Sequence, residues 1–539
     1  MKKNFQSFGV MIDMSRNAVM SIAGLERFLP LLKKMGYNCV LLYMEDTYEV
    51  DGEPYFGYMR GRYTKEEMKH MDAFAASLGI TVIPCIQTLA HLQTTFRWGK
   101  VPVDCNDILL TDDERTYELI DHMFATLSEC FGSRLIHVGM DEAHMLGRGK
   151  HLDVHGYEEP ISIIKRHLDR VCEIGKKYDY ELMIWSDMYF RPWNDGKYYT
   201  PKCEMPKQTV ESLPESVIPV YWDYYKSEKQ MYSDMMYNHK QLSNKTWFAG
   251  GAWSWSGMLP FNRFTLESML PALDACMEHG IKNVFMTMWG DDGAECSHFS
   301  QLPALFYLAE YAKGNRDEAR IKEKFAKSFG IDYDEFMTID APNDVIPYTG
   351  RPRNPSKYML FSDYFNDFLD YTIKEGVGEA YYREIAQKLH ATAKKSRKYG
   401  YVFDCAAKLC DVLAIKYDLG LRTRRAYEAG NKEELARLAK NEYAKLPSLI
   451  NAYGRSFEKQ WFRDNKPHGF DVQDHRIGAL IRRTDACRRR ILDYVEGRID
   501  RIEELDQPLL PYRGAEESIH LNKSAIITTV NATSHCAIT

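Results

Sequence analysis

Eight short apolar runs recur along the first 310 or so residues, and longer segments with helical spacing separate them. The runs begin at Ser7, Cys39, Ile80, Leu135, Leu182, Val217, Thr246 and Asn283. Each run is apolar almost throughout, as expected for a parallel strand that is covered on both faces. Eight strands alternating with helices predict a closed (β/α)8 barrel.

The segments between the runs support this reading. In the first of them, one helical face carries Leu25, Phe28, Leu29, Leu32 and Met35. Several of these helices reach the next strand through a glycine, which readily takes the left-handed conformation that ends a helix. A doubly wound open sheet is the alternative fold. It is disfavoured because no glycine-rich phosphate loop follows the first strand and because eight strands fit closure.

The pattern changes after about Lys313, where amphipathic helices follow one another without convincing strands. The final stretch is rich in serine and threonine. We therefore expect three parts: a catalytic barrel over 1–312, an α-helical domain over 313–512 and a polar C-terminal tail over 513–539. The fold class is α/β, a (β/α)8 TIM barrel followed by an α-helical C-terminal domain.

Composition and charge narrow the range of partners. The net charge of −6 argues against nucleic acid, because phosphate contacts need clustered lysine and arginine. The 12 cysteines are scattered without a CxxC pair, so we expect buried, reduced thiols. No signal peptide or membrane span is recognised, and we expect a cytoplasmic protein that binds no membrane. No cofactor is predicted, and the sequence leaves a homodimer open.

Polar and aromatic side chains gather at the carboxyl ends of the predicted strands, where barrel enzymes build their active sites. Carboxylates supply acid–base chemistry, and tryptophans stack on the apolar faces of sugar rings. Together they predict a carbohydrate site. The residues concerned are Asp13, Arg16, Glu45, Asp46, Gln87, His91, Asp141, Glu142, Trp185, Asp187, Tyr221, Asp223, Trp253, Trp255, Trp289, Asp291 and Asp292.

The segment His137-Val-Gly-Met-Asp141-Glu142-Ala-His144 after the fourth strand resembles the His/Asn-x-Gly-x-Asp-Glu motif of glycoside hydrolase family 20, the β-N-acetylhexosaminidases. Further segments resemble the family in the same order: Gly9-x-x-x-Asp13-x-x-Arg16, Trp185-x-Asp187, Tyr221-x-Asp223 and Trp289-x-Asp291.

Two features depart from the family. The segment Gln87-Thr-Leu-Ala-His91 keeps a histidine but lacks the aspartate that precedes it in the family, so the charge support of His91 is in question. Many members also carry an α/β domain before the barrel, whereas this sequence starts directly on the first strand. The chain thus resembles a member that lacks this N-terminal domain.

The resemblance implies an exo-acting β-N-acetylhexosaminidase that hydrolyses terminal, non-reducing β-linked GlcNAc or GalNAc. Neighbouring strand residues point to opposite faces, so Asp141 and Glu142 are awkward as an ordinary acid–nucleophile pair. The family instead uses the 2-acetamido oxygen of the substrate as nucleophile, with retention and an oxazolinium intermediate.

The resemblance also implies a role for each site residue. Asp141, Glu142 and Tyr221 are the expected catalytic residues: Glu142 as acid and base, Asp141 as acceptor of the acetamido N–H, and Tyr221 as donor to the acetamido oxygen. The expected substrate-binding residues are Arg16, His91, Trp185, Asp223, Trp253, Trp289 and Asp291.

Other readings stay open. A retaining glycosidase for a sugar without an acetamido group and a non-catalytic carbohydrate-binding barrel are both alternatives. His137 and His144 suggest a metal site as a further alternative. Their spacing is not that of a helical HExxH motif, so no metal is assigned. We expect a buried strand histidine at 137 and a loop residue at 144. The sequence does not decide between GlcNAc and GalNAc, nor the linkage or aglycone.

Overall fold

Eight parallel strands close into a barrel in the computed structural model, which describes residues 4–291, 293–346, 348, 350, 352–367, 370 and 373–510. The strand order around the barrel is β1-β10-β9-β8-β7-β6-β3-β2, and β1 pairs with both β2 and β10. The strands are β1 (Ser7–Asp13), β2 (Cys39–Tyr43), β3 (Thr81–Cys85), β6 (Leu135–His137), β7 (Glu181–Trp185), β8 (Ile218–Trp222), β9 (Trp247–Gly251) and β10 (Asn283–Met288). Each predicted run overlaps one of them, which confirms the barrel.

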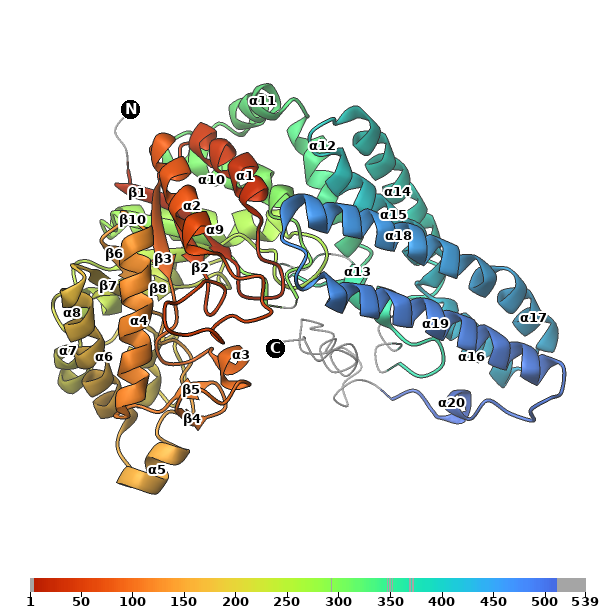
Figure 1. The fold of residues 1–539 in the computed structure, drawn as a ribbon. Helices are drawn as coiled ribbons and strands as arrows, with labels where there is room; N and C mark the ends of the chain where they lie inside the picture. The colour runs from red at the N-terminus through yellow and green to blue at the C-terminus, as the bar shows by residue number, and fades with distance from the viewer. Residues whose placement is uncertain are drawn as a thin grey trace. The chain divides into compact units, whose positions relative to one another are not determined.

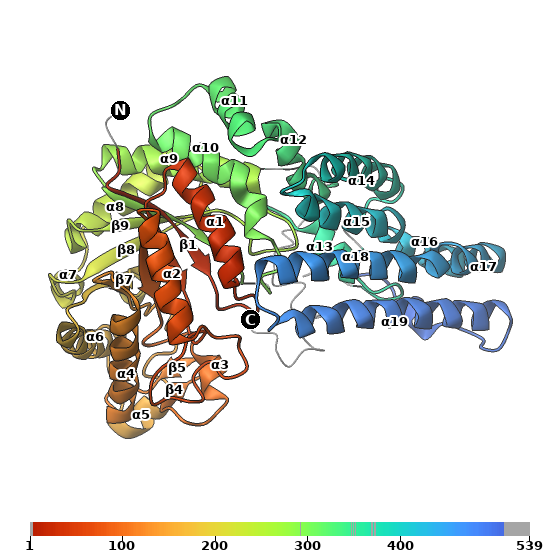
Figure 2. The same cartoon turned by 45° about the horizontal axis from the view of Figure 1, so that its top comes forward.

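Helices surround the barrel strands (Figures 1 and 2). They are α1 (Ile22–Met35), α2 (Lys65–Ser77), α4 (Glu114–Cys130), α6 (Pro160–Lys177), α7 (Lys207–Ser212), α8 (Lys229–Leu242), α9 (Asn262–Glu278) and α10 (Leu302–Ala312). Gly36 ends α1 with a φ of 102°, as the sequence predicts. Gly9 allows close strand contact, because a Cβ there would lie 2.7 Å from the carbonyl oxygen of Cys39.

A small antiparallel hairpin between β3 and α4 was not expected from the sequence. It consists of β4 (Val103–Cys105) and β5 (Ile108–Leu109), and the short helix α3 (Gln93–Phe96) precedes it. The helix α5 (Lys150–His155), which follows β6 in the chain, contacts β4. Asn106 takes a left-handed φ of 47° in the turn, and Asp107 follows it. The hairpin thereby brings an acidic side chain to the region after β3.

The chain divides into two compact units. The first comprises Met1–Ala252, Thr265–Trp289 and Ala304–Asp317, and the second comprises Trp253–Phe264, Gly290–Pro303 and Glu318–Thr539. Two segments before residue 312, those after β9 and β10, therefore belong to the second unit. The predicted tail (513–539) and Asp292 lie outside the described residues.

The described part of the second unit contains helices and no strand. The longer ones are α11 (Glu318–Phe329), α14 (Gly378–Lys395), α15 (Gly400–Lys416), α16 (Leu419–Glu428), α17 (Lys432–Lys440), α18 (Glu442–Asp464) and α19 (Phe470–Val495). The shorter ones are α12 (Tyr333–Met337), α13 (Pro355–Phe361) and α20 (Glu503–Asp506). Within it, Glu295 is buried between Lys357 and Arg476, at 2.8 Å and 2.7 Å. Across the described residues, no helix has the length and apolar character needed to cross a membrane.

Candidate active site

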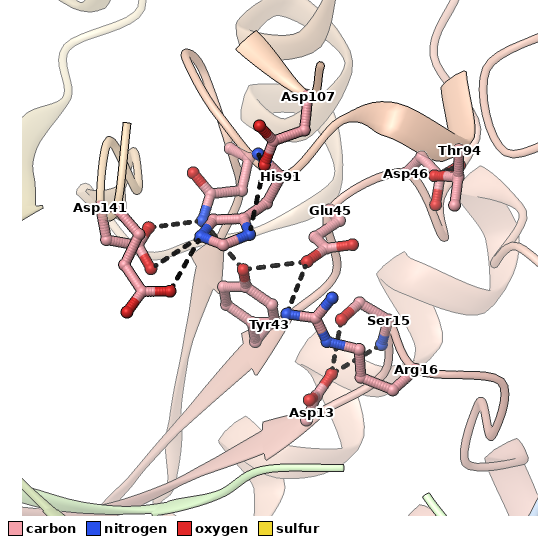
Figure 3. A network of polar contacts seen from close by, with 12 residues as sticks. Asp13, Ser15, Arg16, Tyr43, Glu45, Asp46, His91, Thr94, Asp107 and Asp141 are labelled. Atoms are coloured by element: carbon pink, nitrogen blue, oxygen red, sulfur yellow. Dashed lines mark hydrogen bonds and ion pairs between the residues drawn. The ribbon is translucent and has the colours of Figure 1, made fainter. Parts of the chain in front are cut away.

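A continuous polar network joins the carboxyl ends of the first strands inside the barrel unit (Figure 3). The side-chain amide of Gln87 donates to Oδ1 of Asp141 at 2.7 Å and to the hydroxyl of Tyr43 at 2.9 Å. Tyr43 in turn donates to Glu45 at 3.0 Å, and Arg16 lies 3.5 Å from the same carboxylate. The predicted residues Arg16 and Asp141 are therefore connected through three intervening side chains.

Two neighbours hold Asp141 in its ionised form. The Nε2 atom of His91 lies 3.3 Å from Oδ2 of Asp141, and Gln87 donates to Oδ1. Burial opposes the charge of Asp141, but the imidazolium and the amide outweigh it and hold its pKa below the ordinary value. Asp141 is thus an anion with a fixed orientation.

His91 receives the charge support that its sequence segment had left in question. The backbone N–H of His91 donates to Asp107 at 3.1 Å, and Nδ1 lies 3.8 Å from the same carboxylate. Burial disfavours the imidazolium, yet Asp141 more than compensates and raises the pKa of His91 to about 9. The segment before His91 has no aspartate in this chain, and the hairpin turn brings one, Asp107, to His91 instead.

This shift predicts a pH dependence of stability. The pKa of His91 is raised from about 6.5 in the unfolded chain to about 9, so its stabilising effect is full below about pH 6.5 and is lost as the pH rises through about 9. The difference is worth about 3 kcal/mol. We expect the urea-unfolding free energy of the wild type to fall over this window. A His91→Asn variant should lack this component, and equal pH profiles of the two proteins would contradict the shift.

A left-handed loop after β6 presents Glu142. Gly139, Met140 and Glu142 have φ angles of 74°, 69° and 52°. A Cβ at position 139 would lie 2.0 Å from Oε1 of Gln87, so only glycine fits there. The same Gln87 oxygen accepts the backbone N–H of Met140 at 3.1 Å. This turn, rather than strand geometry, sets the directions of the two adjacent carboxyls.

Glu142 differs from Asp141 in its surroundings. Its side chain is 43% exposed, and its backbone N–H donates to Asp187 at 3.1 Å. Arg191 lies 3.7 Å from its carboxylate and binds Asp187 at 3.0 Å. Desolvation, followed by the negative charges of Asp141 and Asp187, raises the pKa of Glu142. A raised pKa favours the protonated form that a general acid needs.

Aromatic side chains line the barrel interior beside this pair. Trp289 lies 6.0 Å from Trp185 and meets Tyr43 edge-on at 4.7 Å between ring centroids. Trp289 donates through Nε1 to the hydroxyl of Tyr224 at 3.1 Å. Trp185 is only 1% exposed, and its indole N–H has no hydrogen-bond partner among the described residues. Trp185 and Trp289 thus form an apolar wall, and the indole N–H of Trp185 is a donor without a partner among the described residues.

Tyr221 is not part of this arrangement, which corrects its predicted position. Its ring packs 4.6 Å from His239 of α8, and its hydroxyl donates to Asp223 at 3.0 Å. The neighbouring Trp222 instead lies 3.5 Å from Asp187 through its indole nitrogen. Successive strand residues face opposite sides, so Tyr221 faces the helical layer. Asp223 is buried beside it, and this burial raises its pKa to about 6.

Two of the remaining predicted residues, Trp253 and Asp291, lie in the second unit, where Trp253 stacks on Trp255 at 4.1 Å. His137 is a fully buried strand residue, and burial lowers its pKa to about 3. His144 is exposed in the loop after Glu142.

Several contributors were missed by the sequence analysis, namely Tyr43, Asp107, Arg191 and Tyr224. Two of them carry a spacing signal. Tyr43 is the last residue of β2 and stands two residues before Glu45, and Arg191 stands four residues after Asp187. Asp107 and Tyr224 lie in loops, where no such periodicity applies.

Two family models match this sequence. The model described as glycosyl hydrolase family 20, catalytic domain, matches residues 5–231. The model described as glycoside hydrolase 20C C-terminal domain matches residues 334–523. The two matches follow the same order as the predicted barrel and helical domain.

Curated relatives and solved structures are similar over part of the chain. Hexosaminidase D from Bos taurus is 24% identical over 215 residues, covering 39% of this chain and 60% of the relative. Hexosaminidase D from Homo sapiens is 22% identical over 237 residues, covering 41% of this chain and 45% of the relative. The chain thus spans about half the length of the curated relatives it matches.

Among solved structures, a GH20 exo-β-N-acetylglucosaminidase from Vibrio harveyi has 14% identity and a TM-score of 0.47, covering 62% of this chain and 58% of that one. A β-N-acetylhexosaminidase from Bacteroides fragilis has 15% identity and a TM-score of 0.46, covering 60% of this chain and 69% of that one. Because catalytic and C-terminal models of one family both match, in order, the chain belongs to glycoside hydrolase family 20.

Proposed function

We propose that this protein is a β-N-acetylhexosaminidase that removes terminal, non-reducing β-linked GlcNAc or GalNAc. The observation that carries the proposal is the contrast between the two adjacent carboxyls. Asp141 is buried and held as an anion by His91 and Gln87, whereas Glu142 is half-exposed with a raised pKa. Pairs of titratable groups whose environments push their pKa values apart are typical of acid–base sites.

In the proposed reaction the substrate supplies its own nucleophile. Glu142 gives its proton to the glycosidic oxygen as the C1–O bond breaks, and the acetamido oxygen attacks C1 to form an oxazolinium ion. Asp141 accepts a hydrogen bond from the acetamido N–H and stabilises the positive charge that develops there. Water then attacks C1 while Glu142 takes a proton from it, and the bond from C1 to the acetamido oxygen breaks, which restores the acetamido group and gives overall retention. Holding the internal nucleophile in position replaces a bimolecular encounter.

The acetamido group needs an apolar wall and a donor to its oxygen. Trp185 and Trp289 supply the wall in this proposal. Tyr224 takes the donor role in place of Tyr221. The hydroxyl of Tyr224 accepts the indole N–H of Trp289, one of the two wall residues. The hydroxyl of Tyr221 instead donates to Asp223. Arg16 and its partner Glu45 are assigned to the sugar hydroxyls. Binding roles for His91, Asp223, Trp253 and Asp291 stay predictions from the family resemblance.

A substrate panel tests the proposal. We expect hydrolysis of chromogenic β-N-acetylglucosaminide or β-N-acetylgalactosaminide, and little hydrolysis of the matching β-glucoside and β-galactoside, which lack the internal nucleophile. A thiazoline analogue of the oxazolinium ion should inhibit competitively. Turnover of the glucoside at a similar rate would favour the non-acetamido glycosidase, and sugar binding without turnover would favour the carbohydrate-binding barrel. Hydrolysis without thiazoline inhibition would reject the substrate-assisted mechanism alone.

A further inference from the structure

Three side chains that can bind a metal ion meet beside the short helix α5 (Lys150–His155). They are Asp112, His151 and His155, and one ligand atom from each lies within 4.8 Å of the other two. We propose that these three residues bind a Zn²⁺ ion, with water in the fourth position and Glu158 beside the site. The two histidines for which the sequence raised a metal site, His137 and His144, are not among them. None of the three proposed ligands belongs to the carboxyl pair Asp141 and Glu142, and the metal proposal does not rest on the proposed glycosidase activity.

The two histidines have the spacing that places ligands on one side of a helix. His151 and His155 are four residues apart on α5, and their ring centroids are 4.7 Å apart. Asp104 anchors the start of the helix by accepting the backbone N–H groups of Gly147 at 2.8 Å, Gly149 at 3.2 Å and His151 at 2.8 Å. The first histidine is therefore held in place before any ion binds.

His151 is the buried member of the cluster, and the only polar partner near its Nε2 atom among the described residues is Glu158, at 3.3 Å. Its other ring nitrogen, Nδ1, lies 3.3 Å from the hydroxyl of Thr111, and this contact orients the ring. An outer contact on the second nitrogen is the usual support of a metal-binding histidine.

Two carboxylates, those of Asp112 and Glu158, define the charge of the site. Oε1 of Glu158 lies 3.3 Å from Nε2 of His151. Arg166 binds Asp112 at 2.8 Å and Glu158 at 2.9 Å, which orients both groups and neutralises one of the two negative charges. With neutral imidazoles, one negative charge is left for a cation. Two imidazole nitrogens and one carboxylate oxygen suit Zn²⁺ with a water ligand, whereas Ca²⁺ and Mg²⁺ prefer oxygen alone.

The site would join two connections of the barrel unit. Asp112 lies between β5 and α4, and the histidines follow the loop that carries Glu142. A bound ion would therefore fasten the far end of the loop that presents the proposed acid. His155 and its neighbours Leu152 and Val154 are exposed, so an ion has access from solvent.

Direct metal binding by the full chain tests the inference. Protein freed of metal by a chelator is titrated with Zn²⁺ alone against a chromophoric competitor at neutral pH. We expect one ion per chain and a Kd that rises ~10–100-fold or more in His155→Ala. The matched control is His70→Ala, which removes an exposed histidine of α2 whose partner is Glu26. Its Kd should equal that of the wild type.

Cobalt substitution gives a second readout that does not depend on stability. Co²⁺ in place of Zn²⁺ should give the intense visible absorption of a four-coordinate nitrogen–oxygen site in the wild type, and a weaker band in His155→Ala. Because His155 is exposed, the variant is expected to keep its fold, which circular dichroism checks. Absence of stoichiometric zinc binding by the wild type, or equal affinity in His155→Ala, would overturn the proposal.

Discussion

Replacing Glu142 by glutamine is expected to slow hydrolysis of a β-N-acetylglucosaminide with a poor leaving group ~10²–10⁴-fold, the usual worth of general acid–base catalysis. Glutamine keeps the size of the side chain and the backbone N–H bond to Asp187, but it cannot deliver a proton. Steady-state kinetics measure the effect as a fall in kcat/KM. The loss should shrink for an activated aryl leaving group, which departs with little protonation.

The pH profile of the wild type gives an independent check of Glu142. Its raised pKa should move the basic limb of kcat/KM above the position expected for an ordinary glutamic acid, and Glu142→Gln should remove that limb. Glu118→Gln, an exposed position on α4, serves as the matched control and should keep full activity. Unchanged turnover of the poor substrate in Glu142→Gln would exclude this residue as the acid.

Asp141→Asn is expected to lower kcat ~10²–10³-fold, the effect of removing one electrostatic contact made in the transition state. The neutral amide cannot stabilise the positive charge on the acetamido nitrogen. Binding of the thiazoline inhibitor should weaken as well, since that ligand resembles the charged intermediate.

A second signature separates this role from simple misfolding. Asp141 provides the largest favourable contribution to the raised pKa of His91, so that pKa should fall from about 9 in Asp141→Asn. Titration of the His91 ring by NMR measures it in the folded variant. Full activity with unchanged thiazoline affinity would show that Asp141 does not orient the acetamido group.

The sequence predicted the barrel well because buried parallel strands leave a strong local signal. Runs such as those at Cys39 and Asn283 are apolar almost throughout, and β2 and β10 occupy them. The same feature explains the error at Tyr221. In a strand buried on both faces, composition does not distinguish the side that faces the barrel interior from the side that faces the helices. The choice between Tyr221 and Trp222 therefore needed the structure.

Loop contributions were largely beyond reach of the sequence. One contact of His91 is with Asp107, sixteen positions later on a hairpin whose two strands are very short. Nothing in the local pattern ties that turn to the end of β3. Conversely, the acid pair was found because its motif is contiguous, although the left-handed backbone that directs the two side chains was not anticipated.

That backbone has a consequence for the heat resistance of the enzyme. Met140 and Glu142 both carry a side chain in the left-handed region, at a cost of about 1–2 kcal/mol each. Glycine would relieve the cost at either place, but at position 142 it would delete the proposed acid, and at 140 it would loosen the loop that presents it. Engineers who seek a thermostable form should therefore leave this loop alone, since stability gained there is set against activity.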